Sequence, residues 1–519
     1  MVWKLKTKTL KLFSVILVLN IILSLASGCI MNDTSTQLFV YCEDGLYRIS
    51  LSTNGKPQKE KIISPEIEYE GEKEDFPFAL PIWNSPYFFF PKKINPSFTS
   101  QFCYPSISND GKKIIGFSGS RTYDCWNILS WIEEVGSNNK FLLDLVFNEP
   151  IDDRKNYCIH DAWFSPVRDE IFYIIYDDVY EEDGDRTKTE LWKTDLNLKN
   201  KVGLTEDLGD LAYSGRVSFL LYLPIILSPD GERILFYVGD YLWIMNSDGI
   251  GKRNISEEME KEIGKTDPEL EVYVHGLQAN FTPDGKKIVM FLEVVWREEE
   301  SGWEDHKYEL WIMDIDGSNK KKLLGESKEF TLSSWIPFLI TPDGKKIIFY
   351  GATSKTGKDE YVKQDLWSMN IDGTDKKNLT ASFEKEPETN SLSIEFMPYI
   401  NISPDGRKIV FEFAYYHITK GEISFSLGIA NTDGSGARDI LKEAKEENTE
   451  LKEVPTHAGL TIPFFYPCFT PDSKNVIFIS YGGPHLWIIS EDGKNIVNIS
   501  KTCDLKIWSD FMKSFIPGG

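Results

Sequence analysis

A short turn motif that returns through most of the chain constrains the fold more than any other feature. It reads Ser-Pro-Asp-Gly at residues 228–231, and an apolar run, a Leu-Trp-Ile-Met run and an Asp-Gly pair follow it in that order. The same order returns at 282–324, 341–380, 403–441 and 470–500, and two less regular copies begin at Ser108 and Ser165. This recurrence predicts one structural unit of roughly 60 residues that stacks against its own copies.

Each piece of the unit has a physical reason. Proline presets φ at the second position of a type I turn, and glycine is tolerated at the fourth. The β-branched run predicts one strand, the Leu-Trp run a second, and Asp-Gly favours a tight hairpin into a third. An apolar segment before each turn supplies an innermost strand, expected near Tyr104, Trp163, Ile225, Asn280, Phe338, Ile400 and Cys468. Four antiparallel strands per unit form the blade of an all-β propeller.

These units resemble the TolB-like, or WD40-like, propeller repeat, and the resemblance covers residues 37–510. TolB is a periplasmic component that pairs with envelope lipoproteins, so the resemblance implies a binding role outside the cytoplasm. A separate domain like the N-terminal domain of TolB is not expected in this chain. Related propellers also precede the hydrolase domain of prolyl-oligopeptidase-type enzymes.

The number of blades follows from how the ring closes. Residues 37–64 look like an eighth unit that lacks its first strand, and Asp504–Ser509 resembles that missing strand. Pairing of the N- and C-terminal strands in one blade removes an open sheet edge, which is otherwise prone to aggregation. We therefore expect eight four-stranded antiparallel blades, with seven as the alternative, followed by a tail at 511–519.

The N-terminus predicts export and a lipid anchor. A lysine-rich start precedes an apolar stretch, Leu12–Leu25, that is shorter than a membrane span and ends in small residues, as secretory signals do. Ala26-Ser27-Gly28 before Cys29 resembles the lipobox of prokaryotic lipoproteins. The resemblance implies a signal peptide at 1–28, lipidation of Cys29, a linker at 29–36, and a location in the periplasm or at the cell surface. An uncleaved signal anchor is the alternative.

Six further cysteines permit three disulfides in an exported chain. In the eight-blade arrangement Cys42 and Cys503 fall in one composite blade, and a bond between them would close a very long loop. Cys103 with Cys125 is a second candidate pair. Free buried thiols are the alternative.

Two segments depart from the repeat. Residues 65–100 are rich in proline and aromatic residues, including Trp83, Tyr87, Phe88, Phe89 and Phe90. We expect a structural pad over one face of the ring, and alternatively an exposed binding loop. The second insertion, Trp296–His306, is acidic, and we expect an extended, solvated hairpin.

The search for catalytic or metal-binding residues is largely negative. There is no Gly-x-Ser-x-Gly nucleophile motif, no Gly-rich phosphate loop, and no His-x-His or CxxC pair. Asp314-x-Asp316-Gly resembles the start of a calcium loop, but the same Asp-Gly recurs as a turn in most units. His160, His275 and His457 precede turns of the repeat and could approach one mouth of the ring. Asn254, Asn378 and Asn498 stand in Asn-x-Ser/Thr sequons at one repeat position.

The net charge of −23 repels phosphate backbones and anionic headgroups, which argues against nucleic-acid binding. We expect a membrane-anchored lipoprotein whose ring binds a protein or an extracellular ligand without a cofactor or metal, and we favour binding over catalysis. The alternatives are a propeller-based lyase or glycan hydrolase with an axial site, and a solute-capture lipoprotein that serves a transporter and is capped by the 65–100 segment.

Overall fold

The structure is a computed structural model, and it describes most of the chain between residues 36 and 504. The described ranges are 36–42, 45–51, 57–63, 66–69, 72–75, 106–107, 113–119, 128–134, 140–142, 157–165, 167–181, 184–208, 225–266, 270–298, 304–325, 332, 338–353, 363–385, 392–417, 422–447, 467–470, 472–480 and 485–504.

Nearly all described elements are strands of antiparallel sheets. The first sheet has three strands, β1 (Thr36–Cys42), β2 (Gly45–Leu51) and β3 (Gln58–Ile63), and the hairpin of β4 (Glu66–Tyr69) and β5 (Glu72–Asp75) follows. The next sheets contain four strands each. They are β6 (Ser106–Ile107), β7 (Lys113–Gly119), β8 (Ile128–Glu134) and β9 (Lys140–Leu142), and then β10 (Tyr157–Phe164), β11 (Glu170–Glu181), β12 (Gly184–Asp195) and β13 (Val202–Gly203).

Five more four-stranded sheets complete the described part of the chain. They are β14 (Ile225–Leu227), β15 (Arg233–Val238), β16 (Tyr241–Asn246) and β17 (Arg253–Asn254); β18 (Glu271–Phe281), β19 (Lys287–Arg297), β20 (Glu304–Asp314) and β21 (Lys321–Gly325); β22 (Phe338–Ile340), β23 (Lys346–Thr353), β24 (Lys363–Asn370) and β25 (Lys377–Asn378); β26 (Leu392–Ile402), β27 (Lys408–His417), β28 (Glu422–Asn431) and β29 (Arg438–Asp439); and β30 (Cys468–Phe469), β31 (Asn475–Ser480), β32 (His485–Ser490) and β33 (Ile496–Asn498). Short helices follow four of these sheets: α2 (Ile255–Ile263) with η3 (Gly264–Thr266), η4 (Ala381–Lys385), α3 (Ile440–Glu447) and α5 (Ile499–Thr502).

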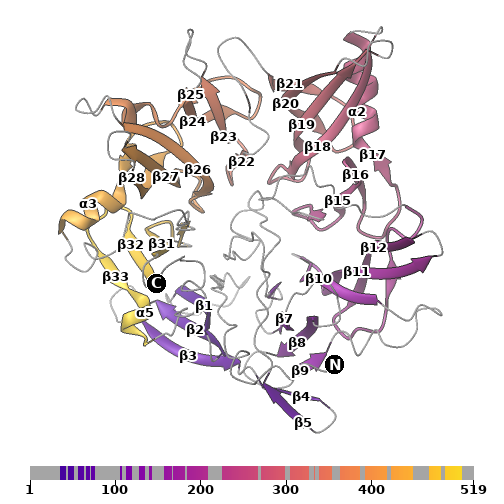
Figure 1. The fold of residues 1–519 in the computed structure, drawn as a ribbon, viewed down its shortest axis with the longest axis horizontal. Coiled ribbons are helices and arrows are strands. Elements are labelled where there is room, and N and C mark those ends of the chain that lie inside the picture. Colours follow the sequence, from indigo (N-terminus) through magenta and orange to yellow (C-terminus); the bar gives the residue numbers. More distant parts are fainter. Residues whose placement is uncertain are drawn as a thin grey trace.

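The sheets lie around a common centre, as the blades of a propeller do (Figure 1). In each four-stranded sheet the strands follow chain order, so the first strand is an edge strand. That first strand lies nearest the centre in sheets such as β18–β21 and β26–β29 (Figure 1). The all-β class and the four-stranded antiparallel units predicted from the repeat are therefore confirmed.

The Ser-Pro-Asp-Gly turn has the predicted geometry. At residues 228–231 the Gly231 amide donates to the Ser228 carbonyl at 2.8 Å, and Gly231 has φ +70°, a conformation that costs a residue with a Cβ about 1–2 kcal/mol. The Ser228 hydroxyl donates to Asp230 and accepts the Arg233 amide at 2.9 Å. The same pattern of hydroxyl, aspartate and backbone contacts recurs around Thr282, Thr341, Ser403 and Thr470.

The Asp-Gly pair lies in a wider turn than the predicted tight hairpin. Gly249 (φ +87°) is the fourth residue of its turn, because its amide donates to the Asn246 carbonyl at 2.9 Å. The Asn246 amide in turn donates to the Ile250 carbonyl at 2.9 Å, which encloses three residues in the loop. Glycine is needed here for its positive φ at the end of the turn.

Apolar side chains fill the space between neighbouring sheets. Leu235 of β15 and Phe281 and Met290 of the next sheet share one buried cluster with Met259 of α2. Burial of each such side chain stabilises the fold by roughly 1.5–3 kcal/mol. Helix α2 begins after Asn254, whose Oδ1 accepts the Glu257 amide at 3.1 Å, and thereby extends the core outward.

Buried amide side chains also connect innermost strands of neighbouring sheets. Gln278 of β18 accepts the Phe338 amide at 2.9 Å and donates to the Phe338 carbonyl at 3.1 Å. Asn401 of β26 accepts the Phe469 amide at 3.2 Å. Because a buried hydrogen bond is costly to leave unmade, these amides fix the register between sheets.

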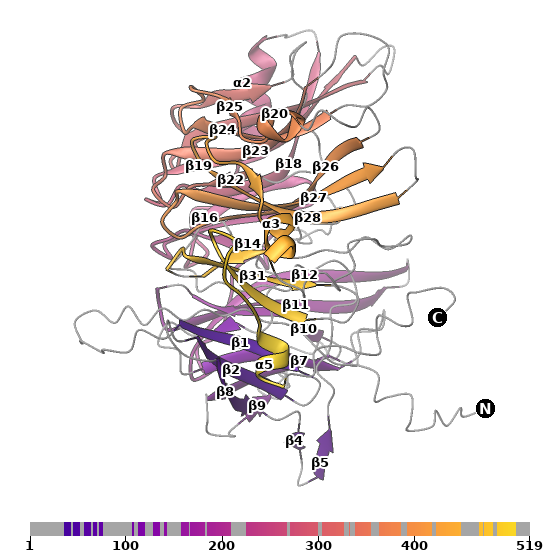
Figure 2. The ribbon, with the colours of Figure 1, turned by 90° about the vertical axis from the view of Figure 1, so that its left-hand side faces the viewer.

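Two faces of the ring follow from the strand order. The Ser-Pro-Asp-Gly and Asp-Gly turns lie together, because the first and third connections of a four-stranded meander emerge on one side; we call this the turn face. The second connections emerge on the opposite side. There, the hairpins β11–β12, β19–β20 and β27–β28 have strands of 10 to 12 residues, and we call these three hairpins the arms and their side the arm face. The sheets β14–β17, β22–β25 and β30–β33 have second and third strands of six to eight residues. Figure 2 shows β11, β12, β27 and β28 extending toward the same side.

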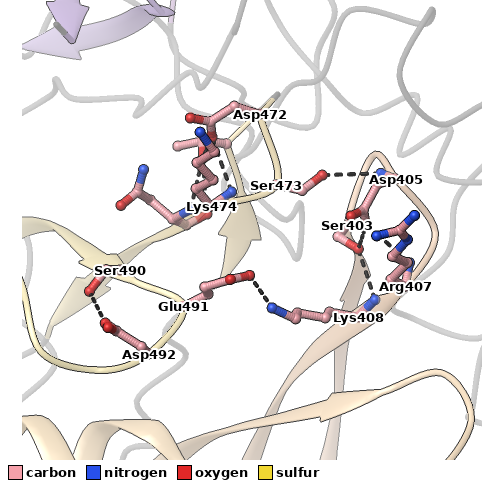
Figure 3. Close-up of polar contacts among 12 residues, drawn as sticks. Ser403, Asp405, Arg407, Lys408, Asp472, Ser473, Lys474, Ser490, Glu491 and Asp492 are labelled. Carbon is pink, nitrogen blue, oxygen red and sulfur yellow. Dashed lines mark hydrogen bonds and ion pairs between the residues drawn. The ribbon is translucent and has the colours of Figure 1, made fainter. Parts of the chain in front are cut away.

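Polar contacts hold neighbouring sheets together at the turn face (Figure 3). Lys408 pairs with Glu491 of the next sheet, and the Asp405 amide donates to the Ser473 hydroxyl at 3.1 Å. A similar tie joins Arg168 to Glu232 and Ser247.

The described chain ends approach each other at the β1–β3 sheet. Lys59 Nζ donates to the Asp504 carbonyl at 2.9 Å, and the Cys503 thiol lies 3.6 Å from the Pro57 carbonyl. The predicted closing strand, 504–509, lies outside the described residues beyond Asp504. Cys503 is a free, buried thiol, so the predicted Cys42–Cys503 disulfide is not formed. Its Sγ is directed at a backbone carbonyl of the loop before β3 instead.

Candidate functional site

Several predicted site residues lie outside the described residues. These are the lipidation site Cys29, the cysteines Cys103 and Cys125, His457, and the aromatic residues Trp83, Tyr87, Phe88, Phe89 and Phe90. Only the opening of the 65–100 insertion is described, and it forms the β4–β5 hairpin. Among the described helices, none combines the length and the apolar character that a membrane crossing requires.

The calcium-like sequence at Asp314–Gly317 is a turn. Asp316 Oδ1 accepts the Ser318 hydroxyl at 2.6 Å and the Ser318 amide at 2.9 Å, and these bonds lower the pKa of Asp316. Asp314 accepts the Asn319 side chain at 2.6 Å and pairs with Lys287. Both carboxylates therefore serve turn geometry, and the described residues contain no cluster of three or more metal-ligating side chains.

The three sequons also have a structural explanation. In each, the Ser or Thr hydroxyl is buried and accepts the backbone amide that lies 14 residues earlier, at the leucine of the Leu-Trp run. Ser256 accepts from Leu242 at 3.0 Å, and the other pairs are Thr380 with Leu366 and Ser500 with Leu486. Thr205, which has Gly203 rather than asparagine two residues before it, makes the same bond to Leu191 at 2.9 Å. The repeated Asn-x-Ser/Thr thus joins the outer strand to the third strand of the sheet.

Of the three histidines expected near a mouth of the ring, His275 has a described side chain. It lies on β18, the innermost strand of its sheet, at the arm face. Its Nδ1 is 3.7 Å from Asp240 Oδ2 of the β15–β16 turn in the preceding sheet. His275 Nδ1 and Asp240 Oδ1 are both buried and make no hydrogen bond. The Gly276 amide donates to the Asp240 carbonyl at 2.9 Å, which holds this turn against β18.

Tyrosine and glutamate side chains lie on the two elements that carry this pair and on α2. Burial and the carboxylates of Glu260 and Glu257 raise the pKa of Tyr241, which follows Asp240 in the turn. Burial also raises the pKa of Glu260 on α2, whose Oε1 accepts the Val274 amide at 3.1 Å. On β18, the hydroxyl of Tyr273 donates to Glu271 at 3.0 Å, and this hydrogen bond raises the pKa of Tyr273.

A second histidine lies on the same face of the β18–β21 sheet. Glu293 of β19 is directly opposite His275 in the strand register, so both side chains point to one face. Glu293 Oε1 lies 3.0 Å from His306 Nδ1 on β20, and His306 Nε2 lies 3.6 Å from Glu304. Carboxylates and imidazoles therefore alternate from the β15–β16 turn across three strands of the arm.

This arrangement is suited to proton transfer. An imidazole whose Nδ1 faces a carboxylate is oriented to accept a proton at Nε2, and a tyrosine whose pKa is raised, such as Tyr241 next to Asp240 in the turn, remains a hydroxyl donor. The described part of the cluster has one arginine, Arg297, with its Nε 3.9 Å from Glu304, so it does not form a dedicated anion site.

Sequence reasoning identified His275 but missed Asp240 and Glu293. Asp240 belongs to another sheet, 35 positions earlier, and its approach depends on how two sheets pack. Glu293 was detectable, because an acidic residue interrupts the apolar run of β19 in Phe-Leu-Glu-Val-Val. His160 is at a break in the β10–β11 register, but its side chain lies outside the described ones.

Comparison with known proteins identifies fold neighbours only. No family model and no curated protein matches the chain. Similar solved structures include the β-propeller domain of the Trilobed protease from Pyrococcus furiosus, with 13% identity, 78% of this chain and 97% of that chain covered, and a TM-score of 0.38. Oligogalacturonate lyase from Vibrio parahaemolyticus has 15% identity, 62% and 88% coverage and a TM-score of 0.27. The tricorn protease has 9% identity and a TM-score of 0.33; the match covers 91% of this chain but 44% of the protease. Likenesses this distant assign no activity to the chain.

Proposed function

We propose that this chain is a lipid-anchored, extracytoplasmic TolB-like propeller whose arm face binds a protein or an extracellular ligand. One observation carries the binding role: every second sheet from β10 to β29 extends into an arm, and the arms project from one face. Rigid sheets that hold projecting hairpins of different sequence are a common basis of recognition. The turn face, by contrast, is made of two turns that repeat from sheet to sheet.

The arms differ in charge, which gives the proposed surface its asymmetry. Residues 176–189 and 293–308 each contain six acidic and two basic residues, whereas residues 414–425 contain one of each. Two arms are therefore strongly acidic and the third is close to neutral. Such a surface disfavours polyanions as partners.

The proposed ring has eight blades and is closed by residues 504–509 beside β1. The contacts of Lys59 with Asp504 and of Cys503 with Pro57 support this closure, because they bring the two described chain ends to one sheet. Deletion of residues 505–519 is expected to lower the unfolding free energy markedly, since it removes the closing strand. Deletion of 511–519 alone is the matched control and is expected to leave stability unchanged; equal effects of both deletions would contradict the closure.

Membrane attachment is tested by fractionation. The Cys29→Ser variant is expected to move from the membrane pellet to the soluble extracytoplasmic fraction and to lose incorporation of labelled palmitate. A variant that stays in the pellet and is still exported favours the uncleaved signal anchor.

The arm face is tested by photo-crosslinking in the intact, anchored chain. A photoreactive amino acid replaces Glu304 on an arm, and a second variant carries it at Ile250, which is 67% exposed on the turn face. Crosslinks from position 304 to another molecule, with none from position 250, are expected. The opposite pattern would move the binding surface to the turn face.

A second candidate is an enzyme whose proton-transfer residue is His275. The observation that favours it is the Asp240–His275 contact at 3.7 Å, in which the buried His275 Nδ1 makes no hydrogen bond. Purified chain is screened against peptide, ester and uronate-containing glycan substrates. Any turnover is expected to fall at least about 100-fold in His275→Gln, as general acid-base contributions do. The variant Val202→Ser, at an exposed position far along another sheet, is the control. Turnover that is equal in both variants excludes His275.

A further inference from the structure

The β18–β20 part of one arm carries two histidines that each lie between carboxylates. His275 has Asp240 at 3.7 Å and Glu293 directly opposite, where cross-strand Cβ atoms are about 5 Å apart. His306 has Glu293 at 3.0 Å and Glu304 at 3.6 Å. The Glu293 side chain is 12% exposed, so its charge is poorly screened by solvent.

The remaining charged and titratable groups near these histidines come from every neighbouring element. From the preceding sheet and α2 they are Asp240, Tyr241 and Glu260; from β18 they are Glu271 and Tyr273; from β19, Glu293 and Arg297; and from β20, Glu304 and Tyr308. Arg297 is the one cation of this set, and it faces Glu304. With both imidazoles neutral, the surroundings hold more negative than positive charge.

We propose that protonation of His275 and His306 latches this arm against the β15–β16 turn of the preceding sheet. A protonated His275 can donate from Nδ1 to Asp240, whose Oδ2 lies 3.7 Å away, and this charge-assisted hydrogen bond gives a partner to the buried Nδ1, which otherwise makes no hydrogen bond. A protonated His306 donates to Glu293 and strengthens the contact between the paired strands β19 and β20. Charges then alternate from Asp240 through His275, Glu293 and His306 to Glu304.

The latch acts in the range in which histidine changes charge, between about pH 5 and 8. At the acidic end the arm is fixed to the neighbouring sheet and its net negative charge is reduced. At the basic end His275 is neutral, so its contact with Asp240 lacks the charge that strengthens it, and the arm is held less tightly. The latch does not depend on the proposed binding role, because it concerns the arm itself.

Amide hydrogen exchange of the full chain, corrected for intrinsic rates, tests the latch at pH 5.5 and pH 7.5. Residues 271–276 and 292–309 are expected to be about three- to tenfold better protected at pH 5.5. The β11–β12 arm contains no histidine and is the internal reference. His306→Gln is expected to remove the pH response at 304–309, and His275→Gln at 271–276.

Asp240→Asn separates the latch from a general loss of structure. It alters neither histidine and leaves the Asp240 backbone carbonyl free to accept Gly276, yet it is expected to abolish the response at 271–276. The proposal is overturned if the β18–β20 arm and the β11–β12 arm respond equally to pH in the wild-type chain. It is also overturned if the double variant His275→Gln/His306→Gln keeps the wild-type response.

Discussion

The turn face and the arm face are opposite ends of the same sheets, yet they are stabilised in different ways. At the turn face each sheet repeats one set of contacts, with a hydroxyl, an aspartate and a glycine of positive φ in fixed places. At the arm face the hairpins differ in length, and the described contacts include cross-strand pairs such as His306–Glu293 and Arg297–Glu304. The comparison teaches that the repeated motif specifies how sheets are built and joined, while sequence variation accumulates where the motif imposes nothing.

Glycine substitutions should show this difference most strongly. Gly373 (φ +85°) is at the turn face, where an added Cβ would lie 3.3 Å from the Leu323 carbonyl oxygen. Gly239 (φ +61°) is at the arm face, where a Cβ would meet nothing within 4 Å. Gly373→Val is expected to cost about 2–4 kcal/mol, from backbone strain plus crowding, and Gly239→Val about 1–2 kcal/mol, from strain alone. Denaturant unfolding measures both, and equal costs would mean that the two faces are equally tolerant.

The two faces should also respond to acid with opposite sign. Hydrogen bonds from the hydroxyl and amide of Thr374 lower the pKa of Asp372 at the turn face below its ordinary 3.8. The ionised Asp372 therefore stabilises the fold at pH values above its ordinary pKa. This stabilisation is lost as the pH falls through the lower pKa that Asp372 has in the folded protein. Burial raises the pKa of Glu260 above its ordinary 4.5, so its cost is present at high pH and is relieved as the pH falls.

Variants separate these contributions in unfolding free energies measured between pH 3 and 7. Asp372→Asn retains an acceptor oxygen for Thr374 and is expected to make the loss of stability in acid shallower. Glu260→Gln removes the destabilisation by the charged Glu260, which is relieved in acid, and is therefore expected to make the loss of stability in acid steeper. A shallower profile in Glu260→Gln would contradict the assigned direction.

Salt bridges should matter more at the turn face. Lys408 and Glu491 join two sheets and have side chains that are 29% and 35% exposed, whereas Arg297 and Glu304 lie on one arm and are both 46% exposed. Lys408→Met is expected to cost about 0.5–1 kcal/mol and Arg297→Met less than about 0.3 kcal/mol. Raising the salt concentration should reduce the loss of unfolding free energy in Lys408→Met. If that loss does not change with salt, it comes from lost packing of the lysine side chain instead.

The sequence predicts the repeated part of this molecule well because the determinants are local. Innermost strands were expected at Ile225, Phe338 and Cys468, and β14, β22 and β30 begin at these residues. The Trp296–His306 insertion was expected as an extended hairpin, and Arg297 pairs with Glu304 at the end of that arm. Turns and strands of this kind depend on a few neighbouring residues.

Contacts between sheets could not be predicted in the same way. The buried pairing of Gln278 with Phe338 spans 60 positions and depends on how two innermost strands approach. The approach of Asp240 to His275 depends on the same packing. The expected Cys42–Cys503 bond failed for this reason, because a shared sheet does not fix where a thiol points, and Cys503 faces Pro57.

One described copy of the Ser-Pro-Asp-Gly turn has serine in place of the glycine of positive φ. Ser473 has φ +61°, and its hydroxyl accepts the Asp405 amide of the preceding sheet at 3.1 Å (Figure 3). The serine therefore exchanges local strain for a tie between sheets. Ser473→Ala keeps the strain and loses the bond, and is expected to cost about 1 kcal/mol.

Ser473→Gly loses the same bond but relieves the strain, so its unfolding free energy is expected to lie within about 0.5 kcal/mol of the wild type. The difference between the two variants, about 1 kcal/mol, then measures the strain itself. If both variants destabilise equally, the backbone at 473 is unstrained and the serine contributes through its hydrogen bond alone. If glycine stabilises clearly, the tie to Asp405 contributes little, and the turn face is held by Lys408, Glu491 and the apolar core beneath them.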